Sequence, residues 1–105
     1  MAERLEILKL MLKQNAVDSF ARYGLAMEYA NRGELELAIE EFRNLLATDE
    51  TYAAAYFHGG QTLEKLGRIE QARDLYEKGI QVTTRTGDGH TRSELQGALD
   101  LLPPS

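Results

Sequence analysis

The chain repeats itself at a spacing of 34 residues. Gly33 and Ala38 recur as Gly67 and Ala72. The same spacing relates four further pairs of similar residues: Tyr23 and Phe57, Leu35 and Ile69, Glu36 and Glu70, and Phe42 and Tyr76. A fixed period of this length is typical of a chain that uses one supersecondary unit several times, because each unit buries its apolar face against its neighbours. The period therefore predicts a stack of repeated units.

Apolar residues recur at helical spacing through most of the chain, and the sequence holds no alternating strand pattern of useful length. We expect six antiparallel helices joined by short turns, at residues 3–14, 19–30, 35–47, 52–66, 69–83 and 91–102. Gly33 and Gly67 are predicted to lie just past two helix ends in the left-handed conformation, which is costly for a residue with a Cβ. The sequence thus predicts an all-α fold.

The least regular part of the pattern lies near the C-terminus. Residues 84–89 are predicted to form the longest break in the chain. Thr91 and Glu94 have the spacing of a capping box, in which each side chain bonds the other residue's backbone amide, so we expect them to start the last helix.

Two adjacent glycines, Gly59 and Gly60, lie inside the fourth predicted helix. Each costs about 0.5–1 kcal/mol relative to alanine at such a position. Close packing against a neighbouring helix explains one of them, and the sequence offers no reason for the other.

Net charge, cysteine content and the distribution of apolar residues exclude several classes of partner and location. The net charge of −5 and the absence of any basic run argue against a nucleic-acid partner, since such affinity depends on clustered Lys and Arg. The chain has no cysteine, so it uses neither disulfides nor thiolate metal sites, and we predict a cytoplasmic location. Residues 5–12 are apolar but contain Glu6 and Lys9, and they are shorter than the about 20 residues that cross a bilayer. We therefore expect no membrane partner and no targeting signal.

The sequence offers little that could carry out catalysis. Its two histidines, His58 and His90, lie 32 residues apart, without the spacing of a helical metal pair. No cysteine nucleophile, glycine-rich phosphate loop or nucleophile elbow is present. Adjacent acids such as Glu40 and Glu41 point apart on a helix. We predict that the chain is not an enzyme and that it uses no cofactor and no metal.

Small and aromatic residues occupy matching places in the two units. Counted from Ser19 and Ala53, the eighth position holds Ala26 and Gly60, the eleventh Tyr29 and Leu63, the twentieth Ala38 and Ala72, and the twenty-fourth Phe42 and Tyr76. In these positions the units resemble tetratricopeptide repeats (TPRs). Two features of the family are missing. The proline usual near the end of each unit is replaced by Glu50 and Thr84, and the fourth position, which is tryptophan-like in the family, holds Arg22 and Tyr56.

The resemblance implies a right-handed helix-turn-helix solenoid that forms a single domain. Its expected parts are an N-terminal half-repeat at 1–18, repeats at 19–52 and 53–86, and a capping helix with its tail at 87–105. The first helix of each repeat would line a concave groove.

The groove residues implied by the resemblance are Phe20, Tyr23, Met27 and Asn31 in the first repeat and Phe57, Gln61, Glu64 and Lys65 in the second. The rings and Met27 would form an adaptable floor for a peptide or helix of a partner protein. Alternatively, the first or the last helix folds over these rings and they are core. Tyr23 and Met27 replace the Lys and Asn of the family's carboxylate clamp, and Asp88 and Arg92 stand at its later basic positions, so an apolar or mixed ligand fits better.

The first helix is apolar on more than one side, which is unusual for a helix covered on one side only. Self-association through Leu5, Leu8, Met11 and Leu12 is therefore a second prediction, with a homodimer as the simplest form. The alternative is that the second helix covers these residues. We thus predict a non-catalytic scaffold or adaptor that binds a partner protein in its groove, or else a homo-oligomerisation module.

Overall fold

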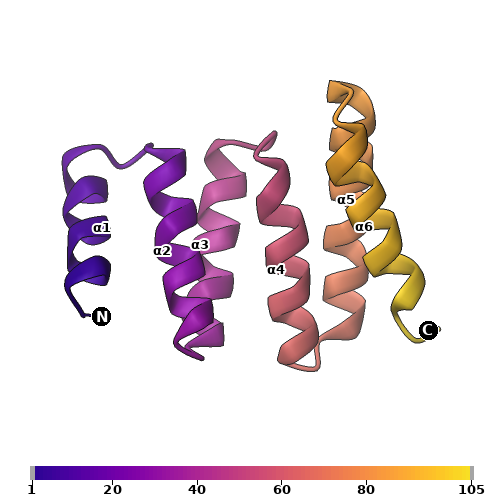
Figure 1. The fold of residues 1–105 in the computed structure, drawn as a ribbon, viewed down its shortest axis with the longest axis horizontal. Coiled ribbons are helices and arrows are strands. Elements are labelled where there is room, and N and C mark those ends of the chain that lie inside the picture. Colours follow the sequence, from indigo (N-terminus) through magenta and orange to yellow (C-terminus); the bar gives the residue numbers. More distant parts are fainter. Residues whose placement is uncertain (1, 105) are drawn as a thin grey trace.

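The computed structural model describes residues 2–104, and these residues form six helices and no strand. The helices are α1 (Ala2–Gln14), α2 (Ser19–Asn31), α3 (Leu35–Thr48), α4 (Ala53–Lys65), α5 (Ile69–Thr86) and α6 (Gly89–Leu101). They stand side by side in a row that has the two chain ends at its opposite ends (Figure 1). Each helix packs on the next one along the chain. The predicted all-α solenoid is confirmed.

Two of the turns depend on glycine, as the sequence predicts. Gly33 and Gly67 adopt φ values of 78° and 76°, in the left-handed region. At each of these glycines, its own amide and the amide of the next residue donate hydrogen bonds to carbonyls in the last turn of the preceding helix. At the first, the amide of Gly33 donates to the carbonyl of Ala30, and the amide of Glu34 donates to that of Tyr29. This Schellman arrangement satisfies carbonyls that the end of α2 would otherwise leave free.

The predicted break at residues 84–89 is wrong, because α5 continues to Thr86. Two threonine hydroxyls near the end of α5 bond back into the helix. The Thr83 hydroxyl donates to the carbonyl of Gly79 at 2.8 Å, and the Thr84 hydroxyl donates to that of Ile80 at 2.7 Å. Such bonds satisfy the hydroxyl without disturbing the helix, so a run of β-branched polar residues remains helical here.

The predicted capping box at Thr91 is also wrong. Gly87, with φ at 79°, ends α5, and Asp88 caps the start of α6. The Asp88 carboxylate accepts a hydrogen bond of 3.1 Å from the Thr91 amide, and this bond lowers the pKa of Asp88. Thr91 is therefore inside the first turn of α6, where its amide needs an acceptor.

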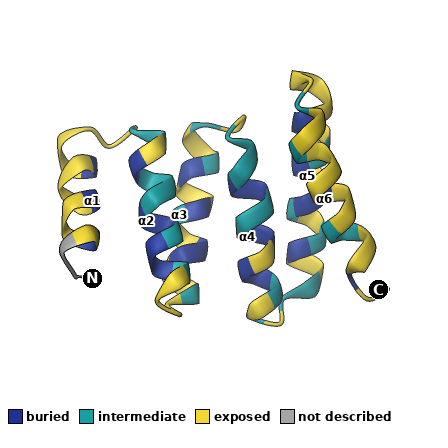
Figure 2. Ribbon diagram, in the orientation of Figure 1, coloured by how far each residue is buried: buried dark blue, intermediate teal, exposed yellow. Residues whose placement is uncertain are grey.

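The core lies along the facing sides of neighbouring helices (Figure 2). Both glycines of the pair in α4 have a structural reason. A Cβ on Gly60 would lie 2.1 Å from Cε1 of Tyr76, and a Cβ on Gly59 would lie 2.9 Å from Cδ2 of Leu75. Ala38 and Ala72 are fully buried. These small residues let helices approach until the rings of the next helix fill the space between them.

The two ends of the row differ. Helix α1 packs on α2 alone, whereas α6 packs on both α5 and α4 and does not contact α2. Within residues 2–104, no helix is both long enough and apolar enough to cross a membrane.

Candidate protein-interaction site

A hollow of about 780 Å³ lies between α1 and α2, and we call it the α1/α2 hollow. Its walls are Arg4, Ile7, Leu8 and Met11 from α1, and Phe20, Tyr23, Gly24 and Met27 from α2. Tyr23 and Gly24 are adjacent, and each lies three or four positions from both Phe20 and Met27, so the four residues share one face of α2. Apart from Arg4, the side chains that line the hollow are apolar or aromatic.

Three of the eight predicted groove residues, Phe20, Tyr23 and Met27, thus lie together. Phe20 is 73% exposed, while Tyr23 and Met27 are half-buried. The alternative in which the C-terminal helix covers these three residues does not hold, since α6 does not contact α2. The first helix does pack on α2, and Tyr23 and Met27 pack against the core that these two helices share, so Phe20 alone of the three is largely exposed.

Tyr23 is held in place by rings from α3 and α4 and from the turn between them. Its ring centre lies 5.1 Å from that of Tyr52, 6.1 Å from that of His58 and 6.3 Å from that of Phe42. Burial raises the pKa of Tyr23, and the neighbouring Tyr52 raises it further. Burial lowers the pKa of His58, although the Glu94 carboxylate offsets part of the effect. These groups therefore present an uncharged aromatic surface at neutral pH.

The predicted groove residues of the second repeat do not line this hollow. Phe57 is half-buried and packs on the core that α5 and α6 share, with its ring centre 5.2 Å from that of His58. Glu64 accepts a hydrogen bond from the Tyr76 hydroxyl, and burial together with this bond raises the pKa of Tyr76. The remaining residues of the predicted set are exposed: Asn31, Gln61 and Lys65. The predicted single groove therefore divides into the α1/α2 hollow and a more open face of α4.

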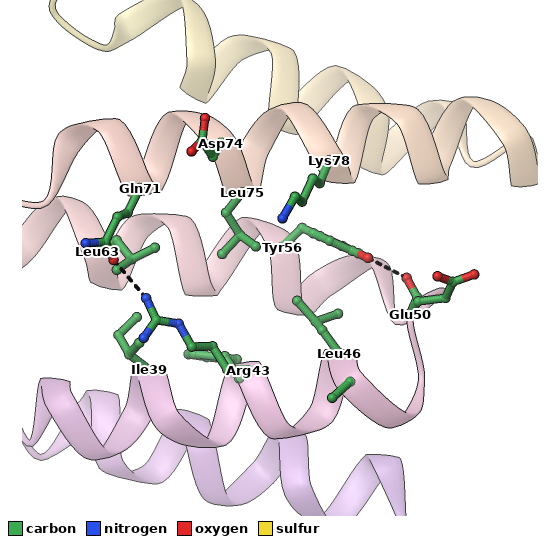
Figure 3. Close-up of a pocket in the computed structure, with 12 residues that line it drawn as sticks. Ile39, Arg43, Leu46, Glu50, Tyr56, Leu63, Gln71, Asp74, Leu75 and Lys78 are labelled. Atoms are coloured by element: carbon green, nitrogen blue, oxygen red, sulfur yellow. Dashed lines mark hydrogen bonds between the residues drawn. The ribbon is translucent and has the colours of Figure 1, made fainter.

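A second depression, of about 450 Å³, lies between α3 and α5 with α4 beneath it (Figure 3). We call it the α3/α5 cleft. Across the cleft, the Arg43 guanidinium of α3 donates a hydrogen bond of 2.8 Å to the side-chain oxygen of Gln71 in α5. At one end the Tyr56 hydroxyl donates to the backbone carbonyl of Glu50 at 2.7 Å.

No predicted groove residue lines the α3/α5 cleft. Its floor holds Tyr56 and Leu63, which are seven positions apart and share one face of α4. Phe57 and Gln61 lie on another face of that helix. No sequence signal distinguishes this cleft, because the apolar residues that line it have the same spacing as those of a closed core.

The residues predicted for self-association need correction. Leu5, Leu8 and Leu12 are buried against α2, as the alternative prediction had it, so they do not form an exposed surface for self-association. The apolar residues of α1 that remain exposed are Ile7 and Leu10, each 57% exposed, and Met11. Among residues 2–104, five of the seven exposed large apolar side chains lie between positions 7 and 20. The exposed apolar surface is thus concentrated at the α1 end of the row.

The described residues contain no group of three or more His, Cys, Asp or Glu side chains that could hold a metal ion. What the α1/α2 hollow offers is apolar contact and one cation, Arg4, which lies 3.1 Å from the Glu28 carboxylate. The lining is mostly apolar, which suits contact with apolar side chains.

The fold and the sequence are similar to those of known repeat proteins. The sequence model of the tetratricopeptide repeat matches residues 53–84. A TPR repeat-containing protein of Pseudomonas aeruginosa is 26% identical over 98 residues, which make up 93% of each chain. The crystal structure of a TPR domain protein from Salinibacter ruber is 38% identical, with a TM-score of 0.73, over 78% of this chain and 91% of that one.

A third similar protein is YrrB, whose structure is described as that of a TPR protein with an unusual peptide-binding site. It is 26% identical, with a TM-score of 0.80, over 92% of this chain and 47% of that one. The chain belongs to the tetratricopeptide repeat family.

Proposed function

We propose that the chain is a non-catalytic interaction module of the cytoplasm, which binds a peptide or helix of a partner protein in the α1/α2 hollow. The TPR fold is a protein–protein interaction module. The observation that carries the proposal is Phe20, whose ring is 73% exposed at the edge of an apolar hollow. The similarity to YrrB, a TPR protein with a peptide-binding site, supports it.

The lining suits an apolar anchor of the partner. Burying one large apolar side chain contributes about 1.5–3 kcal/mol, and exposed aromatic residues at the centre of an interface are common hot spots. Met11 and Met27 have flexible thioether side chains, which adapt to differently shaped partners. Arg4, although close to Glu28, gives the rim one positive group that favours a carboxylate beside the anchor.

Capture of binding partners by the immobilised protein, compared between variants, tests this proposal. Phe20→Ala with Met27→Ala is expected to lose the partner and to keep the helical circular dichroism spectrum of the wild type. Leu101→Ala is the matched control, because Leu101 is also an exposed apolar residue but lies in α6 at the other end of the row. Equal capture by the double variant and the wild type would show that the hollow is not the binding site.

Self-association is a second candidate function, and one observation favours it. The exposed apolar residues of α1, Ile7 and Leu10, lie on a helix that packs on only one other helix of the described chain. A second copy could cover them, and a two-fold dimer is the commonest way to do so.

A further inference from the structure

Helix α1 has an apolar side that nothing in the described chain covers. The corresponding helices of the two repeats each pack on two neighbours: α3 on α2 and α4, and α5 on α4 and α6. Helix α1 packs on α2 through Leu5, Leu8 and Leu12, while Ile7 and Leu10 remain 57% exposed. The other exposed large apolar residues outside positions 7–20, Leu37 and Leu101, stand singly on different helices. Only α1 therefore offers a continuous apolar stripe within residues 2–104.

The charges beside this stripe are arranged so that it complements itself. Glu6 and Lys13 are exposed and lie seven positions apart, on the same edge of α1. Leu10 lies about midway between them. No ion pair within the described residues uses either charge. One edge of the stripe thus carries a negative charge at one end and a positive charge at the other.

We infer that α1 pairs antiparallel with α1 of a second copy of this chain, about a two-fold axis beside Leu10. In this arrangement Glu6 of each copy lies opposite Lys13 of the other, which gives two opposite-charge contacts. A parallel pair would instead set this edge of each helix against the opposite edge of the other, so Glu6 and Lys13 would not meet. Charges that flank an apolar helix seam set partner choice and orientation in this way.

The seam in this arrangement consists of Ile7 and Leu10 from each copy, with Gln14 at its end. These residues follow the spacing of four and three that keeps a helix stripe facing a partner helix. The stripe is short, so the dimer is expected to be weak and to depend on concentration. Met11 lies between the seam and the α1/α2 hollow, so a second copy would partly close that hollow.

The inference rests on the self-association proposed above, and sedimentation velocity over a range of concentrations tests both. The wild type is expected to dimerise. Glu6→Lys alone and Lys13→Glu alone each create two like-charge contacts, so each is expected to weaken the dimer at least about tenfold. An equimolar mixture of the two variants restores both opposite-charge contacts, so it is expected to dimerise again. Glu77→Lys is the matched control, since Glu77 is exposed on α5, and it should dimerise like the wild type.

The outcomes separate the two ideas. A wild type that stays monomeric up to its solubility limit overturns both, including the case in which α1 binds a helix of another protein instead. A wild type that dimerises while the mixture of variants does not recover overturns the antiparallel pairing and leaves self-association standing. Dimers that neither single variant weakens place the contact away from the Glu6 edge of α1, and this result also overturns the inference.

Discussion

A glycine opposite a large ring fixes the distance between α4 and α5. A Cβ on Gly60 would lie 2.1 Å from the Tyr76 ring, which is fully buried and cannot swing away into solvent. The Tyr76 hydroxyl is held as well, because it donates to Glu64. At this contact the packing requirement outweighs the helix propensity that an alanine would add.

Gly60→Ala is therefore expected to lower the free energy of unfolding by about 1–3 kcal/mol, because overpacking exceeds a propensity gain of about 0.5–1 kcal/mol. Gly97→Ala is the matched control: Gly97 lies within α6 with nothing near its Cβ position, so the gain of about 0.5–1 kcal/mol should appear alone. Urea denaturation measures both. Equal shifts in the same direction would contradict the packing argument.

His58 gives the protein a dependence on pH. Burial lowers its pKa below the ordinary value of about 6.5, so the unfolded chain takes up the proton first as the pH falls. The stability that the neutral imidazole contributes is fully present above pH ~6.5 and is lost as the pH drops through that value toward the folded-state pKa.

His58→Gln is thus expected to flatten the fall in melting temperature between about pH 7.5 and pH 5.5 relative to the wild type. Parallel pH profiles for wild type and His58→Gln would rule out this role for burial of the imidazole.

At the scale of a helix, the junction between α5 and α6 depends on one backbone conformation. Gly87 has a φ of 79° and nothing within 4 Å of its Cβ position. A substitution there therefore strains the backbone conformation and causes no steric clash. Gly89, two residues later, has an equally open Cβ position without a positive φ.

Gly87→Ala is expected to destabilise the protein by about 1–2 kcal/mol, which is the cost of the left-handed conformation for a residue with a Cβ. Gly89→Ala should leave stability unchanged or raise it by up to about 1 kcal/mol, because Gly89 lies in the first turn of α6. Thermal unfolding of the two variants separates the cost of the left-handed backbone conformation from the general effect of replacing a glycine by alanine. A Gly87→Ala variant as stable as Gly89→Ala would show that the turn adapts.

The helices themselves could be predicted from the sequence, because their apolar spacing and the glycines at positions 33 and 67 act locally. The end of α5 could not, since it depends on whether threonine hydroxyls bond back into the helix. The reason for Gly59 depends on where Leu75 of α5 comes to lie, which is a tertiary fact.

The candidate site shows the same division between local and tertiary information. The α2 residues of the hollow, Phe20, Tyr23 and Met27, were predicted from their positions in the repeat. Its other wall was not, because α1 carries two apolar stripes. The sequence alone does not say whether α2 covers the stripe with Leu5 or the stripe with Ile7.

At the scale of the whole molecule, the helices differ in how many neighbours support them. Helix α1 packs on α2 alone, whereas α4 packs on α3, α5 and α6 and also contacts α2. In a repeat protein, local stability follows such nearest-neighbour contacts.

We expect the amides of α1 to exchange with solvent deuterium faster than those of α4, in hydrogen exchange followed by mass spectrometry or NMR under native conditions. Raising the protein concentration should slow exchange in α1 and leave α4 unchanged if a second copy covers α1. Identical protection of the two helices in dilute solution would instead mean that the whole row opens as one unit.

The contact between Gly60 and Tyr76 also bears on how such a chain can evolve. The matching positions of the first repeat hold Ala26, which is larger than Gly60, and Phe42, whose ring lacks the hydroxyl of Tyr76. A recombination that joined α2 to α5 would set the methyl group of Ala26 against the ring of Tyr76, while one that exchanged both helices together would keep each small residue with its own ring. Inheritance of this fold is therefore expected to favour crossovers that move helix pairs intact.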